Sequence, residues 1–224
     1  MSETPLERRA RAALKRAEAA ARRTARKNPR QVAAAAALIV ESLESGGTVY
    51  FCGNGGSAAD AQHFSTELAG RFLVDRPALA AVALTTNTSA LTAIGNDYGF
   101  EHVFARQLES TGTPGDVLVA ITTSGGSKNV LEAVRAARRL GMKVVGMTGP
   151  GGTAFARRCD VALVTPSAST PEIQTGHLMM GHALCGLVEE AMVARARRAA
   201  RAAGGAAARR AAPRRSSARP GRGA

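Results

Sequence analysis

Short apolar runs alternate with helical stretches along the middle of the chain. The helical stretches cover residues 57–70, 100–109 and 127–140. The apolar runs have the length and composition of buried strands, at residues 48–52, 80–84, 116–122, 143–148 and 161–165. Strands that are apolar throughout, and that alternate with helices, are typical of a parallel sheet covered on both faces. We therefore predict an α/β fold, a three-layer α/β/α sandwich around a central parallel sheet.

Helices are also predicted before and after this sheet. Residues 5–28 are rich in Ala, Arg, Lys and Glu, which favours an exposed or partner-packed helix. Pro29 is well placed to begin a second helix over 32–43, and a long last helix covers roughly 171–201. The chain is thus divided into a basic N-terminal helical segment (1–29), one domain (30–203) and a tail rich in Ala, Arg, Gly and Pro (204–224). We predict that this tail is disordered.

Charge is distributed unevenly along the 224 residues. The formal net charge is +13, but residues 1–30 carry ten basic and three acidic side chains, and residues 194–224 carry ten arginines and no acid. The body between them is mildly acidic. Any contact with nucleic acid would therefore involve the ends alone. We expect it to be weak at most, because the C-terminal segment has no aromatic residue to stack on bases.

Several protein classes are excluded by composition. The longest apolar run, 32–40, is mostly alanine and shorter than the roughly 18 residues typical of a membrane span. The first thirty residues carry three glutamates and lack the apolar stretch of a secretory signal. Cys52, Cys159 and Cys185 are odd in number and have no CxxC spacing, which argues against a disulfide framework and a cysteine zinc site. We expect a cytoplasmic protein.

Two turns rich in Gly and hydroxyl residues each follow a predicted strand and precede a helix. They cover residues 51–60 and 121–129. Free backbone N–H groups at a helix start favour an anion, and Ser and Thr hydroxyls add donors. Neither turn has the GxGxxG or Walker lysine pattern, so both are either ordinary turns with N-cap serines or a site for a phosphorylated small molecule. In the second case the 122–127 loop would hold the phosphate, and 54–56 would lie nearer the sugar.

Four side chains are candidate metal ligands. His63 and Glu67 are four residues apart and share one helix face, and Gln174 and His182 are eight apart on the last helix. Such nitrogen and oxygen donors suit zinc or a similar divalent ion. The spacing also fits a surface His–Glu pair and a core histidine, and it leaves His177 as a rival ligand.

These motifs together resemble a known family. The segment 52–63 followed by Glu67, the segment 91–99, the Thr-Ser-Gly loop, and Ile173-Gln174 with His177 and His182 resemble the SIS (sugar isomerase) domain, specifically the phosphoheptose isomerases. The resemblance runs in order from about residue 30 to 193. It departs from the family at Thr122, where serine is usual, and in the long basic tail, which the family does not require.

The resemblance implies a homotetramer whose active sites are shared between subunits, and conversion of sedoheptulose 7-phosphate into D-glycero-D-manno-heptose 7-phosphate. It implies a Zn²⁺ ion and Glu67 with His182 as the acid/base pair. The implied metal ligands are His63, Glu67, Gln174 and His182. The implied substrate-binding residues are Asn54, Gly55, Gly56, Ser57, Glu67, Asn96, Asp97, Thr122, Thr123, Ser124, Ser127 and Gln174.

The chemistry of such a reaction is compatible with these residue types. Moving a carbonyl between C1 and C2 needs a base, an acid for the oxygens and stabilisation of the developing negative charge. Glu67 can be the base and His182 the acid. The alternative is a SIS-domain protein that binds a phosphosugar, or a replication initiator, without catalysis. Such relatives lack the catalytic glutamate, and the presence of Glu67, Asn96 and Asp97 favours the enzyme.

Overall fold

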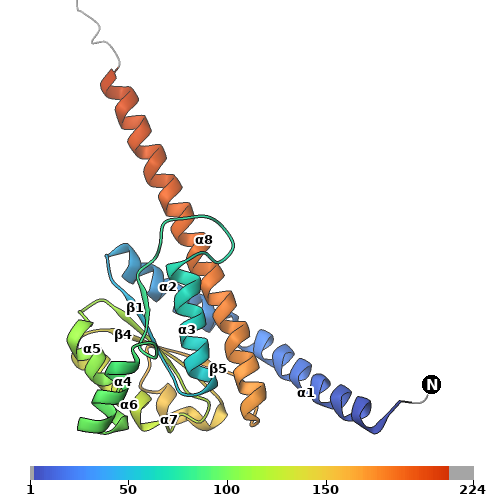
Figure 1. The fold of residues 1–224 in the computed structure, drawn as a ribbon. Helices are drawn as coiled ribbons and strands as arrows, with labels where there is room; N and C mark the ends of the chain where they lie inside the picture. The colour runs from blue at the N-terminus through green and yellow to red at the C-terminus, as the bar shows by residue number, and fades with distance from the viewer. Residues whose placement is uncertain (1–2, 212–224) are drawn as a thin grey trace, which may run out of the picture.

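The computed structural model describes the backbone of residues 3–211 and the side chains of residues 3–202. Five strands alternate with helices (Figure 1). The strands are β1 (Val49–Cys52), β2 (Ala81–Ala83), β3 (Val117–Ile121), β4 (Lys143–Thr148) and β5 (Val161–Val164). The helices are α1 (Pro5–Lys27), α2 (Pro29–Glu44), α3 (Gly56–Ala69), α4 (Thr88–Tyr98), α5 (Ala105–Thr111), α6 (Lys128–Arg139), α7 (Thr153–Ala156) and α8 (Thr170–Ala211), with 3₁₀ turns at Phe100–His102 and Pro150–Gly152.

The strands form one parallel sheet in the order β2-β1-β3-β4-β5. One face is covered by α2, α3 and α8, through a cluster that includes Ile39, Phe64 and Val188. The other face is covered by α5 and α6, through a cluster that includes Leu108 and Val134. The predicted α/β fold with a covered parallel sheet is confirmed. In a sheet of this order, ligands bind where the order reverses, between β1 and β3.

The five predicted strands are present, and the helices differ in several places, among them the short helix α7, which is not predicted. The predicted helix 100–109 is divided into the 3₁₀ turn Phe100–His102 and α5. Helix α4, which the apolar pattern does not indicate, begins where the Asn87 side chain accepts a hydrogen bond from Ala90 N. None of the residues of α4 is buried in this chain. Its apolar side chains Leu91 and Ile94 are only partly buried against the cluster under α5 and α6, and two apolar residues give too weak a periodicity to indicate a helix.

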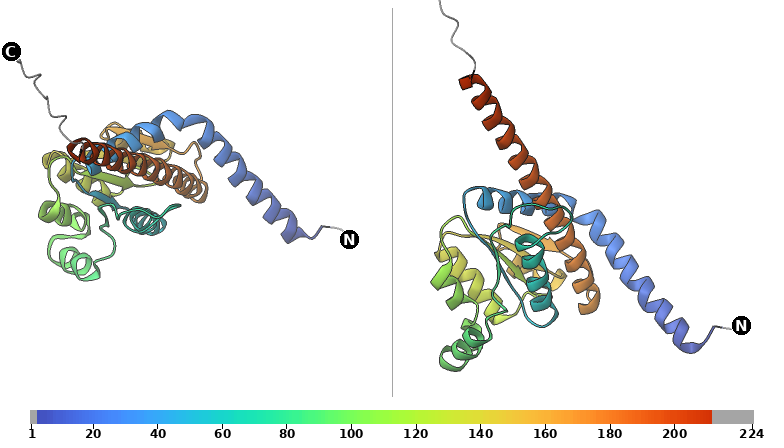
Figure 2. Two further views of the ribbon diagram at one scale, coloured as in Figure 1. Left: turned by 90° about the horizontal axis from the view of Figure 1, so that it is seen from above. Right: turned by 45° about the horizontal axis from the view of Figure 1, so that its top comes forward.

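The two terminal helices project from the sheet domain (Figures 1 and 2). Helix α1 begins with a capping box between Thr4 and Glu7. Helix α8 continues to Ala211, past Gly204, where disorder is predicted to begin, because alanine and arginine are strong helix formers. The remainder of the predicted tail, 212–224, lies outside the described residues. No helix in residues 3–211 is long and apolar enough to cross a membrane.

Two glycines of α8 differ in the space around them. A Cβ atom at Gly181 would overlap the ring of Phe64, which is 1% exposed, whereas one at Gly186 would lie 3.4 Å from the Phe72 ring. Glycine is therefore required at Gly181 for α8 to lie against α3.

We expect Gly181→Ala to lower the free energy of unfolding by about 1–3 kcal/mol, measured by urea denaturation, because overpacking outweighs the gain in helix propensity. The matched variant Gly186→Ala has space for its methyl group and should be neutral or stabilising by up to about 1 kcal/mol. Equal effects of the two substitutions would contradict the close contact.

Candidate active site

The two hydroxyl-rich loops lie side by side at the carboxyl edge of the sheet. They follow β1 and β3, which are neighbours with Cys52 opposite Ala120. The amide of Asn54 in the first loop donates to Asn129 Oδ1 at 2.8 Å, and the Asn129 amide donates to Asn54 Oδ1 at 2.8 Å. Asn129 is buried and is absent from the predicted site residues. Its position directly after the 122–127 loop is the one sequence feature that could have indicated a role in the site. Only the fold shows that Asn129 joins the two loops.

The loop after β3 gathers hydroxyl and amide groups. Thr122 Oγ1 lies 3.1 Å from Ser127 Oγ and accepts a hydrogen bond from Gly125 N, and Gly126 N donates to Ser124 Oγ. Gly125 has φ of 73°, in the left-handed region that favours glycine. The N-cap residue Ser127 makes no capping hydrogen bond, and in the first turn of α6 the Asn129 side chain accepts only from Val130 N, so the N–H groups of Lys128 and Asn129 remain available to an anion. The first turn of α3 also lacks a side-chain cap.

Three of the four predicted metal ligands meet between α3 and α8. His63 Nε2 lies 2.8 Å from His182 Nε2 and 3.5 Å from Glu67 Oε1. One ligand atom from each of the three residues lies within 4.8 Å of the others, and all three side chains are partly buried. We refer to His63, Glu67 and His182 as the His/Glu/His centre.

The donor chemistry of this centre fits a divalent ion. At 2.8 Å one of the two facing imidazole nitrogens must carry a proton if they share a hydrogen bond, and both can be unprotonated when they face a cation. Two imidazole nitrogens and a carboxylate oxygen form a frequent zinc ligand set. Gln174 extends from α8 to the beginning of α3, where a Cβ atom at Gly56 would overlap its amide. It therefore contacts the 54–56 loop.

The structure does not bring every predicted residue to this centre. Asn96 and Asp97 are exposed on α4, where the Asn96 amide donates to Asp97 Oδ1 at 2.8 Å. Asp97 also lines a hollow of about 510 Å³ between β2, α4 and α5. Within residues 3–202, these two side chains make no hydrogen bond to the His/Glu/His centre or to the two loops.

His177, the rival ligand, lies apart from the centre. It is fully buried, and neither ring nitrogen has a hydrogen-bond partner among the described side chains and backbone. Burial lowers the pKa of His177 to about 4, and the backbone of Thr148 opposes this shift only in part. His177 is therefore a neutral core residue in the folded chain at neutral pH.

Comparison with known proteins decides the family. The SIS domain family model matches residues 14–149. A phosphoheptose isomerase of Rhodospirillum rubrum is 58% identical over 161 residues, which is 72% of this chain and 86% of that protein. The chain belongs to the phosphoheptose isomerases of the SIS domain family. As a member of that family it is an enzyme, and the predicted family is confirmed.

Solved phosphoheptose isomerases have the same fold. The enzyme from Neisseria gonorrhoeae is 45% identical with a TM-score of 0.78, and the match covers 83% of this chain and 99% of that one. The enzyme from Francisella tularensis is 39% identical with a TM-score of 0.80, and the match covers 84% of this chain and 100% of that one. Nearly the whole of each solved enzyme is matched, and about a sixth of this chain lies outside each match.

The buried His177 makes the stability of this isomerase sensitive to acid. Its folded pKa lies below the unfolded value, so the unfolded chain gains a proton first as the pH falls. Its contribution to stability, about 3 kcal/mol, is complete above about pH 6.5 and is lost as the pH falls to about 4. Urea unfolding of the wild-type chain should therefore lose more stability between pH 7 and pH 4.5 than that of His177→Gln. Equal losses in the two proteins would contradict this assignment.

Proposed function

We propose that the chain interconverts sedoheptulose 7-phosphate and D-glycero-D-manno-heptose 7-phosphate. This reaction would be the first step of ADP- or GDP-activated heptose synthesis. The observation that carries the proposal is the meeting of Glu67 and His182 on two helices, in a family whose relatives are phosphoheptose isomerases. The free cysteines fit the cytoplasmic location that we propose for it.

The proposed mechanism moves one proton between two carbons. Glu67 removes the C1 proton of the ketose, the electron pair forms the C1=C2 bond, and His182 delivers a proton to the C2 oxygen. The enediol then loses its O1 proton to His182, and Glu67 returns the carbon-bound proton to C2, which leaves the aldehyde at C1. The partly buried position of Glu67 and its place beside two imidazoles support these roles.

We propose that the substrate lies along α3, from the 122–127 loop to the His/Glu/His centre. Gly56 and His63 are separated by two turns of α3, or about 10 Å, which an extended seven-carbon sugar phosphate can span. The groups proposed for the phosphate are those of Thr122, Thr123, Ser124 and Ser127. The groups proposed for the sugar are those of Asn54, Gly55, Gly56, Ser57 and Gln174, together with Asn96 and Asp97.

A zinc ion completes the proposed site. His63, Glu67, Gln174 and His182 would hold one ion per chain, and another divalent ion could replace it. When bound, the ion supplies a Lewis acid that polarises the substrate oxygens. The convergence of His63, Glu67 and His182 supports this assignment.

We propose a homotetramer in which neighbouring subunits share the active sites. Asn96 and Asp97 are exposed on α4, which has no buried residue, and would act on the site of a second copy. Apolar surface also remains uncovered: Leu6 and Leu14 of α1 are 77% and 71% exposed. A largely apolar groove of about 930 Å³ lies between α1, α2 and α8, with Met179, Leu187 and Val193 in its wall. A second copy of the chain would cover these surfaces.

Incubation of the purified protein with sedoheptulose 7-phosphate tests the function directly. The aldose product should appear by NMR with a rate proportional to protein concentration. A protein that binds the ketose phosphate and never forms the aldose is instead the non-catalytic phosphosugar-binding protein.

The base assignment is tested by Glu67→Gln. This change keeps the shape and an oxygen donor but removes the basic carboxylate, so we expect turnover to fall by at least about 10²-fold. Binding of the ketose phosphate should persist, because its phosphate is held by the 122–127 loop. His182→Gln should be impaired to a similar extent, and the double variant should be less impaired than the product of the two effects.

The matched control for this variant is Glu132→Gln, on α6. Glu132 pairs with Arg135 on the helix surface, so this control should turn over at the wild-type rate. Glu67→Gln protein with near wild-type turnover would eliminate the mechanism.

Removal of the metal tests the proposed cofactor. The purified chain should contain about one divalent ion, and chelation should lower turnover until zinc is restored. The variant His63→Ala should lose the ion, as measured by elemental analysis, whereas His102→Ala, outside the centre, should keep it. Full turnover of metal-free protein would refute a catalytic role for the ion and leave the acid/base pair intact.

A further inference from the structure

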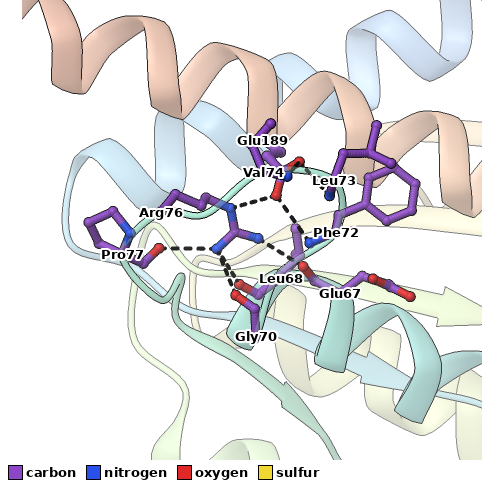
Figure 3. A network of polar contacts seen from close by, with 9 residues as sticks. All are labelled: Glu67, Leu68, Gly70, Phe72, Leu73, Val74, Arg76, Pro77 and Glu189. Atoms are coloured by element: carbon purple, nitrogen blue, oxygen red, sulfur yellow. Dashed lines mark hydrogen bonds and ion pairs between the residues drawn. The ribbon is translucent and has the colours of Figure 1, made fainter.

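A buried ion pair joins the segment after α3 to α8, beyond the residues assigned above. Arg76 Nε donates to Glu189 Oε1 at 3.0 Å, and each side chain is only 3% exposed (Figure 3). Burying two charges is costly unless their remaining hydrogen-bonding groups are also satisfied. Here both groups are satisfied, and their further partners lead to the two helices that carry the proposed acid/base pair.

Arg76 binds the C-terminal end of α3. Its guanidinium donates to the backbone oxygens of Glu67 at 2.8 Å and Leu68 at 2.9 Å, and also to those of Gly70 and Pro77. The last carbonyl groups of a helix have no partner within the helix, and a cation there interacts favourably with the helix dipole. One of these carbonyl groups belongs to Glu67 itself. Arg76 therefore holds the backbone of the proposed base.

Glu189 holds the segment 72–74 against α8. Its carboxylate accepts hydrogen bonds from Phe72 N at 3.1 Å, Leu73 N at 2.8 Å and Val74 N at 3.2 Å. Burial raises the pKa of Glu189, but these N–H groups and Arg76 outweigh it, so the pKa lies below its ordinary value and the group is ionised at neutral pH.

The same contacts lead to the proposed acid. The ring of Phe72 lies 5.9 Å, centroid to centroid, from the ring of His182. His182 precedes Glu189 by seven residues, or two helical turns, so both lie on nearly the same face of α8. Glu189 thus fixes the backbone of the residue whose ring packs beside His182.

We propose that Arg76 and Glu189 are positioning residues that hold Glu67 and His182 in register across α3 and α8. The ring of Phe64 at Gly181 sets how closely the two helices approach near the His/Glu/His centre. Directional hydrogen bonds run from the backbone of α3 through the Arg76 guanidinium to the Glu189 side chain of α8, and these fix the position of one helix relative to the other at the far end of the contact. This inference rests on the function proposed above. A displacement near 1 Å at an acid/base pair is enough to cost about 10²-fold in rate.

The test compares Arg76→Lys and Glu189→Gln with a matched control, Asp116→Asn. Asp116 is also a buried carboxylate that accepts loop N–H groups, from Thr48 and Thr113, but it lies directly before β3 and its hydrogen bonds go to loops beside that strand rather than to α3 or the segment 72–74. Arg76→Lys keeps the positive charge and loses the several N–H donors of the guanidinium. Glu189→Gln keeps the shape of the side chain and loses its negative charge. Both should lower kcat by about 10- to 100-fold with KM changed less than about threefold, because the substrate is bound at the other end of α3.

Asp116→Asn should lower Tm by a comparable amount and leave kcat unchanged. If kcat of the two test variants, corrected for the folded fraction, also stays at the wild-type value, the ion pair is merely structural and the inference is overturned. In a Glu67→Gln background, Arg76→Lys should reduce the residual kcat by less than about threefold, since the group it positions is already lost. A full additional loss there would overturn the inference as well.

A second readout does not depend on the reaction. In histidine-ring NMR spectra, the signals of His182, assigned with His182→Gln, should move in Arg76→Lys and Glu189→Gln and remain in place in Asp116→Asn, because Phe72 lies beside this ring. Unmoved His182 signals in folded Glu189→Gln would overturn the inference. A wild-type chain that is inactive on sedoheptulose 7-phosphate would refute the proposed function. The NMR spectra would still show whether Arg76 and Glu189 position the ring of His182.

Discussion

Helix α8 lies against α3 at Gly181, where the ring of Phe64 occupies the space that any larger residue would need. This contact determines what the rest of the site can be, because α3 carries His63 and Glu67 while α8 carries His182. His182 is 119 residues from His63 in the sequence, so no local interaction can bring it to the other two side chains. Burial of the apolar faces of both helices against the sheet supplies the driving force. Arg76 and Glu189 then add directional contacts at the far end of the same interface.

The sheet order makes a second contribution to the site. Strands β1 and β3 are neighbours, so the loops that follow them leave the same edge side by side. The paired amides of Asn54 and Asn129 join these loops and satisfy each other's hydrogen-bonding groups. The hydroxyl groups of the second loop and the first turns of α3 and α6 thereby lie at one edge of the sheet, and the His/Glu/His centre lies further along α3. A phosphate group at one end and an isomerising carbon at the other fit this arrangement.

Helix α4 is attached to the domain in a different way from the other helices. It has no buried residue in the single chain, and Asn96 and Asp97 near its end bond to each other rather than to the centre. The two terminal helices also extend away from the sheet domain (Figure 2). The sheet, with α3 and α8, thus forms a complete core within one chain. The exposed parts are those that the proposed tetramer would bring to a neighbouring copy.

The sequence by itself determined the strands, most of the helices and the two loops, because apolar runs and glycine-rich turns are local properties of the chain. It also placed His63 and Glu67 on one helix face, since four residues are close to one turn. Spacing on α8 alone left both His177 and His182 as ligands. Five residues rotate a helical side chain by about 140°, so only one of the two can face α3, and the tertiary structure turned His182 toward it and buried His177 in the core. The roles of Asn129, Arg76 and Glu189 were likewise decided only by the fold, because each depends on a partner distant in sequence.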